Sequence, residues 1–376
     1  MEFVFILSFF MIFYAYFGYP LSLYFIKQRV CRPVNKKKIA PKVTLIIAAH
    51  NEERNIHCKL LNCLELEYGI DLLQIIVVSD GSTDKTNEIV QSFADRRVQL
   101  LVSSERRGKE CAQKMALLES RGEIVVFSDV ATRIEPSGIQ EIVANFADPS
   151  VGCVSSYDRL LSQDGSPCGE GAYVRYEMWI RKLESNINTL VGLSGSFFAA
   201  RKEYCPDLSS DIDSDFITVL NTVRHGKRAV LDPEAVGFYK DLSDSKKEFQ
   251  RKVRTVLRGM TCFFKNLEML NAFKFGFFSY QLFCHKLFRW LVPFFLILFF
   301  VSNMFLICDS LFYFFVIICQ IIFYILCFLC HIKIISLKFV WSKIPYYFVM
   351  SNIAIALAWF DFLRGVRLHT WQPTTR

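Results

Sequence analysis

Three carboxylates in the first third of the chain each follow a short apolar run of the kind that forms a β-strand. The runs cover residues 43–49, 74–78 and 123–127, and the carboxylates that follow them are Glu52, Asp80 and Asp129. In an open α/β sheet, ligands bind beyond the carboxyl ends of the strands, so we expect these side chains to share one crevice. Acidic groups gathered there suit a divalent metal ion that carries a diphosphate, because hard cations prefer oxygen ligands.

Further strand-like runs alternate with helical stretches in the same part of the chain. The runs cover residues 98–102, 151–156, 196–200 and 229–231, and helical stretches cover 85–93 and 109–118. This alternation favours βαβ units and a mostly parallel sheet. Lys109 follows a flexible glycine at the start of the second helical stretch, where it would approach a sugar or phosphate oxygen. The alternative is an ordinary solvated lysine at a helix start.

The apolar residues are concentrated near the two ends of the chain. Hydrophobic residues make up 52% of the 376 residues and include 37 phenylalanines, more than a soluble domain normally carries. Apolar runs at 3–26, 291–307, 311–330 and 346–362 are each close to the roughly 20 residues that cross a bilayer. We therefore expect one N-terminal and two to three C-terminal transmembrane helices. The last run is alternatively a re-entrant or interfacial helix, but its apolar length favours a span.

A basic cluster follows the first apolar run and predicts its orientation. The cluster consists of Lys27, Arg29, Arg32, Lys36, Lys37 and Lys38. The positive-inside rule places such a cluster on the cytoplasmic side, so we expect a bacterial cytoplasmic-membrane protein with a cytoplasmic main domain. The cluster can also meet anionic membrane lipids. A cleaved signal peptide is less favoured, since a glutamate rather than a basic cluster precedes the run and no small-residue cleavage site follows it.

The charged residues and cysteines exclude two other classes of protein. The formal net charge of +8 belongs largely to clusters beside the apolar runs. No basic face interleaved with aromatic residues appears elsewhere, which argues against nucleic acid as a partner. The thirteen cysteines are scattered and form no disulfide framework, as expected in a reducing compartment.

Short motifs in a fixed order carry a family resemblance. They read Ile-Ala-Ala-His-Asn-Glu-Glu, Val-Val-Ser-Asp-Gly-Ser-Thr-Asp, Gly-Lys, Val-Phe-Ser-Asp, Gly-Ser-Phe-Phe-Ala-Ala-Arg, Ser-Asp-Phe and Arg-Lys-Val-Arg. Over residues 43–260 the chain resembles a membrane-anchored family 2 glycosyltransferase with a GT-A fold, a group that includes cellulose, hyaluronan and poly-N-acetylglucosamine synthases. The flanking apolar runs also fit this family.

The resemblance implies a set of residues that bind a nucleotide-sugar donor. Glu52 and Asp80 would recognise the nucleoside, with Asp80 accepting a hydrogen bond from a uracil ring. Ala48 or Ala49 would line the pocket through backbone groups, and Lys109 would contact the sugar or the diphosphate. For Asp80 the alternative is a role in capping a turn or helix, which Asp and Gly often fill.

The resemblance also assigns a metal ligand. Asp129 matches the first carboxylate of a D-x-D motif that holds Mg²⁺ or Mn²⁺ against the diphosphate. The second acidic position is occupied by Ala131, so two neighbouring carboxylates are not available. Asp129 with water and the diphosphate would then hold the ion, since Mg²⁺ commonly uses only one or two carboxylates. Thr132 offers a hydroxyl as a weaker ligand.

Asp215 matches the general base of the family, which removes the proton of the acceptor hydroxyl. Ser214 replaces the other acid of the usual pair, and Asp213 is the rival base. The alternative for this group is an acidic loop that caps the following helix at 216–223.

Two arginines match the end of the family pattern. Arg254 would contact the diphosphate, and Arg251 occupies the glutamine position of the Q-x-x-R-W element. Thr255 replaces its tryptophan, which puts processive synthesis in doubt. An interfacial basic face is the alternative interpretation of these arginines.

The sequence predicts six segments. They are an N-terminal anchor at 1–27, a basic linker at 28–42, a GT-A domain at 43–260, interfacial amphipathic helices at 261–289, transmembrane helices at 290–363 and a tail at 364–376.

The predicted activity is an inverting transfer of a sugar from a nucleotide donor, UDP-linked by expectation, to a saccharide or lipid-linked acceptor in cell-surface polysaccharide synthesis. An exporter or other assembly subunits would be further partners. The alternatives are a transferase that adds a single sugar to a glycolipid, and a non-catalytic subunit that binds nucleotide or glycan.

Overall fold

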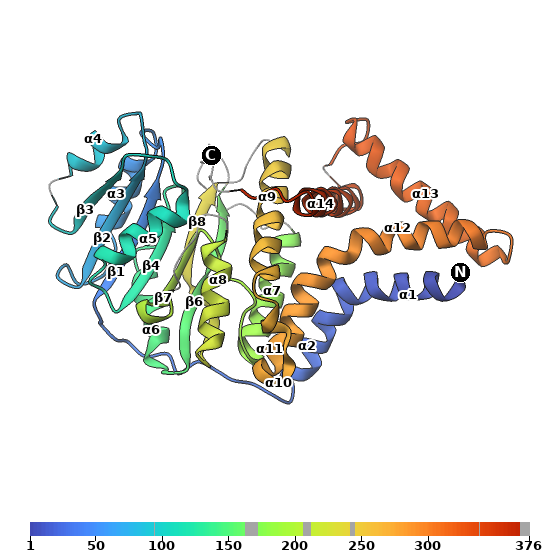
Figure 1. The fold of residues 1–376 in the computed structure, drawn as a ribbon, viewed down its shortest axis with the longest axis horizontal. Helices are drawn as coiled ribbons and strands as arrows, with labels where there is room; N and C mark the ends of the chain where they lie inside the picture. Colours follow the sequence, from blue (N-terminus) through green and yellow to red (C-terminus); the bar gives the residue numbers. More distant parts are fainter. Residues whose placement is uncertain (94, 162–171, 206–211, 241–244, 338, 369–376) are drawn as a thin grey trace. The chain divides into compact units, whose positions relative to one another are not determined.

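The computed structural model describes residues 1–93, 95–161, 172–205, 212–240, 245–337 and 339–368 (Figure 1). They form two compact units. The sheet unit comprises Leu23–Ser243, Thr261–Ser279 and Arg367–Arg376, and the helical unit comprises Met1–Ser22, Asp244–Met260 and Tyr280–Val366. The predicted tail at 364–376 lies partly outside the described residues.

The sheet unit is built on one eight-stranded sheet. Its strands are β1 (Val43–Ala49), β2 (Leu73–Asp80), β3 (Val98–Ser103), β4 (Ile124–Asp129), β5 (Arg133–Ile134), β6 (Val151–Leu161), β7 (Phe197–Arg201) and β8 (Arg228–Lys240). Their order in the sheet is β3-β2-β1-β4-β7-β6-β8-β5. Every strand-like run of the sequence therefore became a strand, and β6 and β8 are longer than the runs that predicted them.

The sheet is mixed, and two strands, β7 and the short β5, run opposite to the others. β1 pairs in parallel with β2 and β4, β2 with β3, and β6 with β8. β7 runs antiparallel to both β4 and β6, with Ser128 opposite Phe197, and β5 runs antiparallel to β8. The segment that precedes β7 consequently lies at the carboxyl end of β4.

Helices cover the sheet because its central strands are apolar on both faces. The helices of this unit are α3 (Ile56–Leu64), α4 (Thr86–Gln91), α5 (Lys109–Glu119), α6 (Gly138–Ala144), α7 (Ala172–Ile187), α8 (Ser214–Arg224) and α10 (Ala272–Phe275), with short 3₁₀ turns η2 (Asn145–Ala147), η3 (Lys202–Tyr204) and η4 (Leu267–Leu270). All seven residues of β1 are buried. Leu45 and Ile47 belong to one core cluster with Ile56 and Leu60 of α3. Such two-sided burial is typical of a parallel sheet between helix layers.

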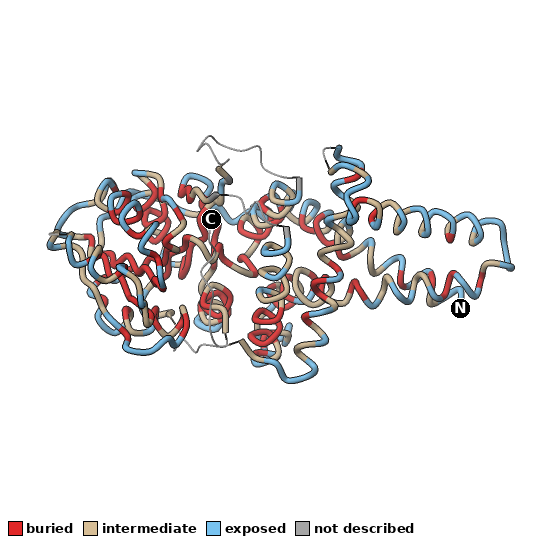
Figure 2. Tube along the Cα trace, turned by 90° about the horizontal axis from the view of Figure 1, so that it is seen from above, coloured by how far each residue is buried: buried red, intermediate tan, exposed pale blue. Residues whose placement is uncertain are grey.

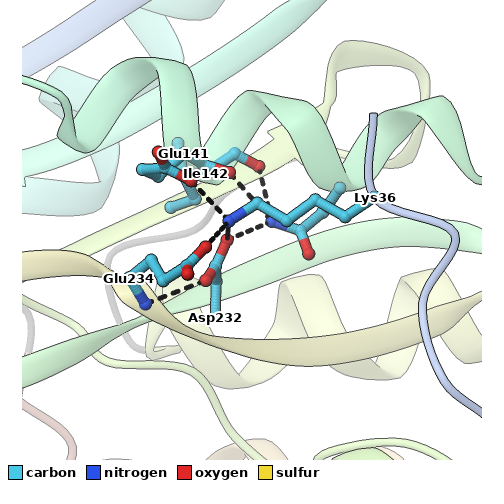
Figure 3. Close-up of polar contacts among 6 residues, drawn as sticks. Lys36, Glu141, Ile142, Asp232 and Glu234 are labelled. Atoms are coloured by element: carbon cyan, nitrogen blue, oxygen red, sulfur yellow. Dashed lines mark hydrogen bonds and ion pairs between the residues drawn. The ribbon is translucent and has the colours of Figure 1, made fainter. Parts of the chain in front are cut away.

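The basic segment before β1 lies against the sheet unit instead of forming a free linker. The ammonium group of Lys36 contacts Glu141 of α6 at 2.5 Å, and Asp232 and Glu234 of β8 at 3.0 and 2.5 Å (Figure 3). Asp232 is almost completely buried and also accepts a hydrogen bond from Asn145 at 2.5 Å. Burial opposes the charged form of Lys36, but the three carboxylates outweigh it and raise its pKa. The Lys36 side chain is therefore paired with carboxylates of the sheet unit, and lipid contact of the basic cluster remains a prediction.

Replacing Lys36 with methionine should destabilise the sheet unit. Three carboxylates would then face one another without a cation, and removing a charged hydrogen-bond partner costs roughly 2 kcal/mol. Thermal unfolding of the purified protein would measure the effect. Lys37→Met is the matched control, since Lys37 is exposed and contacts the unit through its backbone N–H to Ala144. An equal change in both variants would contradict the role of the Lys36 cluster.

The helical unit contains helices long and apolar enough to cross a membrane. Its helices are α1 (Glu2–Phe13), η1 (Tyr14–Gly18), α2 (Tyr19–Lys27), α9 (Ser245–Phe264), α11 (Phe277–Leu282), η5 (Phe283–Phe288), α12 (Arg289–Leu306), α13 (Leu311–His331) and α14 (Val340–Leu363), of which α2, α9 and α11 continue into the sheet unit. Within the described residues, four candidate spans cover Glu2–Lys27, Phe277–Leu306, Leu311–His331 and Val340–Leu363. One N-terminal and three C-terminal helices of sufficient length confirm the predicted arrangement, and the crossing of the bilayer by the last helix remains a prediction.

The exposed side chains of these helices are mostly apolar, whereas the exposed side chains of a soluble protein are mostly polar. Buried residues are concentrated around the sheet, whereas the long helices show mostly exposed and intermediate positions (Figure 2). Phe9, Phe315 and Phe328 are each more than half exposed. Large exposed apolar faces mark contact with lipid or protein. The first C-terminal span also begins earlier than predicted, since its helical run starts at Phe277 rather than 291.

Side-chain hydrogen bonds join segments of the helical unit that are far apart in sequence. The hydroxyl of Tyr280 lies 2.7 Å from that of Tyr14 and 2.6 Å from that of Ser22. The indole N–H of Trp359 donates to the backbone carbonyl of Trp290 at 2.8 Å. These bonds connect α14 and the N-terminal helix to the first C-terminal span.

Candidate functional site

Asp129 and Lys109 form an ion pair at the carboxyl edge of the sheet. Asp129 is the last residue of β4, and Lys109 is the first residue of α5. The ammonium nitrogen of Lys109 lies 2.5 Å from Oδ1 of Asp129 and donates to the carbonyl of Gly195 at 3.1 Å. Burial opposes the charge of Lys109, but Asp129 and, to a smaller extent, Glu110 and Asp215 raise its pKa. The ion pair with Asp129 therefore favours the charged form of Lys109.

Asp80 fixes the turn that presents Lys109. It ends β2 and is almost completely buried. Its Oδ1 accepts a hydrogen bond from the backbone N–H of Arg107 at 2.7 Å, and its Oδ2 accepts one from that of Gly108 at 2.8 Å. This geometry matches the turn-capping alternative. The role of Asp80 in recognising a nucleoside remains a prediction.

Asp215 lies in the first turn of α8 and reaches the same site. Its Oδ1 accepts a hydrogen bond from the N–H of Phe216 at 2.7 Å. A Cβ atom placed on Gly195 would lie 2.8 Å from its Oδ2, so a larger residue there would displace this carboxylate. Gly195 thus touches both Lys109 and Asp215. Asp213, the predicted rival base, is the residue that immediately precedes α8.

Glu52 and Ala48 lie on the same edge of the sheet. Ala48 of β1 is paired in register with Asp129. Glu52 is buried, and its carboxylate accepts a hydrogen bond from Asn55 at 2.8 Å. Burial raises the pKa of Glu52, and the negative charges of Asp129 and Asp84 raise it further despite the bond from Asn55. The three carboxylates predicted to share a crevice, Glu52, Asp80 and Asp129, do follow neighbouring parallel strands.

Glu52→Gln should stabilise the protein in a pH-dependent manner. Because the folded state raises the pKa of Glu52, this group contributes most to stability below the ordinary carboxyl pKa of about 4.3 and loses that contribution as the pH rises through the raised value. The variant should therefore have a higher melting temperature than the wild type at pH 8, and this difference in melting temperature should become smaller toward pH 5. Glu65→Gln, at an exposed position, is the control. A difference that does not vary with pH would contradict the buried-carboxylate argument.

Lys59 binds the chain on both sides of Asp129, and the sequence did not identify it as a site residue. It lies on α3 and is almost completely buried. Its ammonium group donates to the hydroxyl of Ser128 at 2.7 Å and to the carbonyl of Thr132 at 2.6 Å, which are on either side of Asp129. Burial lowers its pKa, although Cys63 and Asp129 oppose this effect. The available signal was its spacing, since positions 56, 59, 60 and 63 share one helix face.

The donor atoms at Asp129 fit a divalent cation only if the substrate supplies further ligands. Among the described residues, no group of three His, Cys, Asp or Glu side chains could hold a metal ion. The Asp129 side chain is 31% exposed, and Lys109 takes one of its two oxygens. A single carboxylate oxygen together with phosphate oxygens and water is a common set of Mg²⁺ ligands. The residues present therefore fit an ion that arrives with a diphosphate.

Arg251 and Arg254 belong to α9, in the part of that helix that falls in the helical unit. Arg251 pairs with Glu248 one turn earlier, with hydrogen bonds of 3.0 and 2.7 Å. Their contact with a donor diphosphate remains a prediction.

Comparison with known proteins identifies related sequences. The family profile "Glycosyl transferase family 2" matches residues 44–202. A poly-beta-1,6-N-acetyl-D-glucosamine synthase of Staphylococcus aureus (strain COL) is 27% identical over 230 residues, which cover 58% of this chain and 55% of that protein. The probable glycosyltransferase YdaM of Bacillus subtilis is 31% identical over 134 residues, which cover 34% of this chain and 32% of that protein. The chain thus spans about half the length, or less, of these relatives.

A solved structure supports the fold. The mannosyltransferase PcManGT from Pyrobaculum calidifontis, in complex with GDP-Man and Mn²⁺, has a TM-score of 0.70 at 22% identity. The alignment covers 92% of this chain and 96% of that one. The predicted GT-A fold is confirmed.

Proposed function

We propose that this protein transfers a sugar from a nucleotide donor to a saccharide or lipid-linked acceptor, because residues 44–202 match the profile of glycosyl transferase family 2. The donor is proposed to be UDP-linked, and the reaction inverts the anomeric centre. The product is proposed to enter a cell-surface polysaccharide, and the staphylococcal relative is itself named as the synthase of a polysaccharide, poly-beta-1,6-N-acetyl-D-glucosamine.

One observation carries this proposal. An acidic base candidate, a fixed cation and a potential metal ligand meet around Gly195, contributed by α8, α5 and β4. Transfer of a sugar from a diphosphate needs these three groups together. A carboxylate must take a proton, and positive charge must stabilise the departing phosphate.

The chain's own residues perform the proton transfer in this scheme. Asp215 removes the proton of the acceptor hydroxyl while that oxygen forms a bond to the anomeric carbon of the donor. The bond from that carbon to the phosphate oxygen breaks, and its electron pair leaves with the nucleoside diphosphate. Asp215 retains the proton until solvent takes it.

Positive charge beside Asp129 assists departure. Lys109 is held 2.5 Å from Asp129 and faces the edge where the diphosphate would lie, so its charge is in place before the leaving group develops its own. Mg²⁺ or Mn²⁺, when bound at Asp129 with the diphosphate, would supply further neutralisation. Asp80 acts indirectly, since it orients the turn that carries Lys109.

The four candidate membrane spans support a protein that works at a bilayer. We propose that the sheet unit faces the cytoplasm of a bacterial cell, where nucleotide sugars are made, and that membrane lipids surround the helical unit. An exporter or another polysaccharide-assembly subunit would then receive the product.

A donor panel tests the function. Purified full-length protein would be incubated with individual UDP- and GDP-sugars, Mg²⁺ or Mn²⁺ and membrane extract, and released nucleoside diphosphate would be measured. Release with one donor, dependent on acceptor, supports the proposal. Donor binding without turnover would instead favour a non-catalytic subunit. That alternative is kept because Ala131, Ser214 and Thr255 depart from the family pattern. The length of the product then separates polymer synthesis from the addition of a single sugar.

A further inference from the structure

We infer that Asp158 is a positioning residue that sets the distance between the base and the cation of this site. The inference rests on the proposed function for its catalytic consequence, but its structural part stands on hydrogen bonds alone. Asp158 lies on β6, and neither the motifs nor the comparisons assign it a role. Its side chain acts through the segment 194–196, the loop that leads into β7.

Asp158 binds this loop through two hydroxyl groups. The hydroxyl of Ser194 lies 2.6 and 2.8 Å from the two carboxylate oxygens, and that of Ser196 lies 3.0 Å from Oδ1. The backbone N–H of Ser194 also donates to the hydroxyl of Ser155, at 2.8 Å, on the same strand. Ser194 is almost completely buried. The loop is therefore attached to β6 on both sides of Gly195.

Two residues of this loop, Gly195 and Ser196, lie against the cation, the metal-ligand candidate and the base candidate. The carbonyl of Gly195 accepts a hydrogen bond from Lys109 at 3.1 Å. The carbonyl of Ser196 accepts one from the backbone N–H of Asp129 at 3.0 Å. The Cα of Gly195 faces the carboxylate of Asp215, where an added Cβ would come within 2.8 Å. A shift of this loop would move the cation and the base relative to each other.

The chemistry of the contact requires an acceptor at position 158. Two hydroxyl donors converge on one side chain, and a carboxylate has enough lone pairs for both. Alanine at this position would remove this acceptor and leave the hydroxyls of Ser194 and Ser196, which lie 2.9 Å apart, to bond each other. The loop would then keep the bond from the N–H of Ser194 to Ser155 but lose its attachment at position 158, so it would be free to shift. Displacements of about 1 Å in a catalytic arrangement can reduce the rate about 10²-fold.

The test compares Asp158→Ala and Asp158→Asn with the wild type, using the full-length protein. Hydrogen exchange followed by mass spectrometry would report the backbone amide of Asp129, which donates to Ser196, and the segment 192–197. Asp158→Ala should increase exchange in both places and lower kcat roughly 10- to 100-fold, with a KM for the nucleotide sugar within about threefold. Asp158→Asn keeps an acceptor oxygen, so its hydrogen exchange and its kcat should both be close to those of the wild type.

Asp148→Ala is the matched control. Asp148 also accepts hydrogen bonds from a serine, Ser150, but it precedes the other end of β6. It should leave exchange at 129 and 192–197 unchanged.

Unchanged exchange in Asp158→Ala would overturn the inference, whether or not the protein shows transferase activity. Increased exchange with an unchanged kcat would also overturn it. If the wild type transfers no sugar from any donor, the proposed function fails, and the exchange measurement still decides whether Asp158 holds the loop.

Discussion

Asp215→Asn should reduce the turnover number by about 10²–10⁴-fold, the usual contribution of a general base. Asparagine keeps the size of the side chain and its hydrogen bond with the N–H of Phe216, but it cannot accept a proton. Donor affinity should change little, because the ion pair between Lys109 and Asp129 stays intact. Single-turnover transfer and donor binding, measured on the same preparation, would separate the two effects.

Asp213→Asn distinguishes the two candidate bases. Asp213 lies just before α8, whereas Asp215 is in its first turn and faces Gly195. We expect Asp213→Asn to retain most of the activity. If Asp213→Asn is inactive and Asp215→Asn is active, the assignment of the base is wrong and the roles are exchanged.

Lys109→Met should lower kcat/KM for the nucleotide sugar by about 10²-fold or more, because a preorganised cation at the leaving group is worth that much in comparable sites. Methionine fills a similar volume without charge, so Asp129 would lose its partner at 2.5 Å and Gly195 would lose its donor at 3.1 Å. Released nucleoside diphosphate at several donor concentrations would measure the effect.

Lys114→Met controls for the loss of one positive charge on the same helix. Lys114 is an exposed residue of α5, one turn beyond Lys109. Its variant should keep wild-type kinetics. Equal losses in both variants would show that general charge, and not the cation at Asp129, determines the activity.

Local sequence patterns were sufficient for the strands other than the two-residue β5 and for the candidate membrane helices. Apolar runs that end in polar turns predicted β1, β2 and β4, because strand formation and termination depend on neighbouring residues. The apolar runs near both ends predicted the four spans, because span length follows from bilayer thickness. The same patterns placed Asp80 and Asp129 at the ends of strands, and the structure agrees.

Local patterns could not give the partners of these residues. Asp80 was assigned to a nucleoside, yet its two oxygens accept hydrogen bonds from backbone groups 27 and 28 residues away. Lys59 looked like one more helical lysine, although it donates to residues 69 and 73 positions away. Such contacts depend on which strands become neighbours.

The amino-acid sequence by itself determined the strands other than β5, the candidate membrane helices and the carboxylates at the strand ends, since each depends on residues within one short segment. The tertiary structure alone decided that β7 runs antiparallel to β4. That reversal brings the loop before β7, rather than the residues after it, to Asp129. Gly195 then meets Lys109 and Asp215, and Asp158 holds that loop, because strand order and direction result from packing of the whole sheet and not from any local pattern.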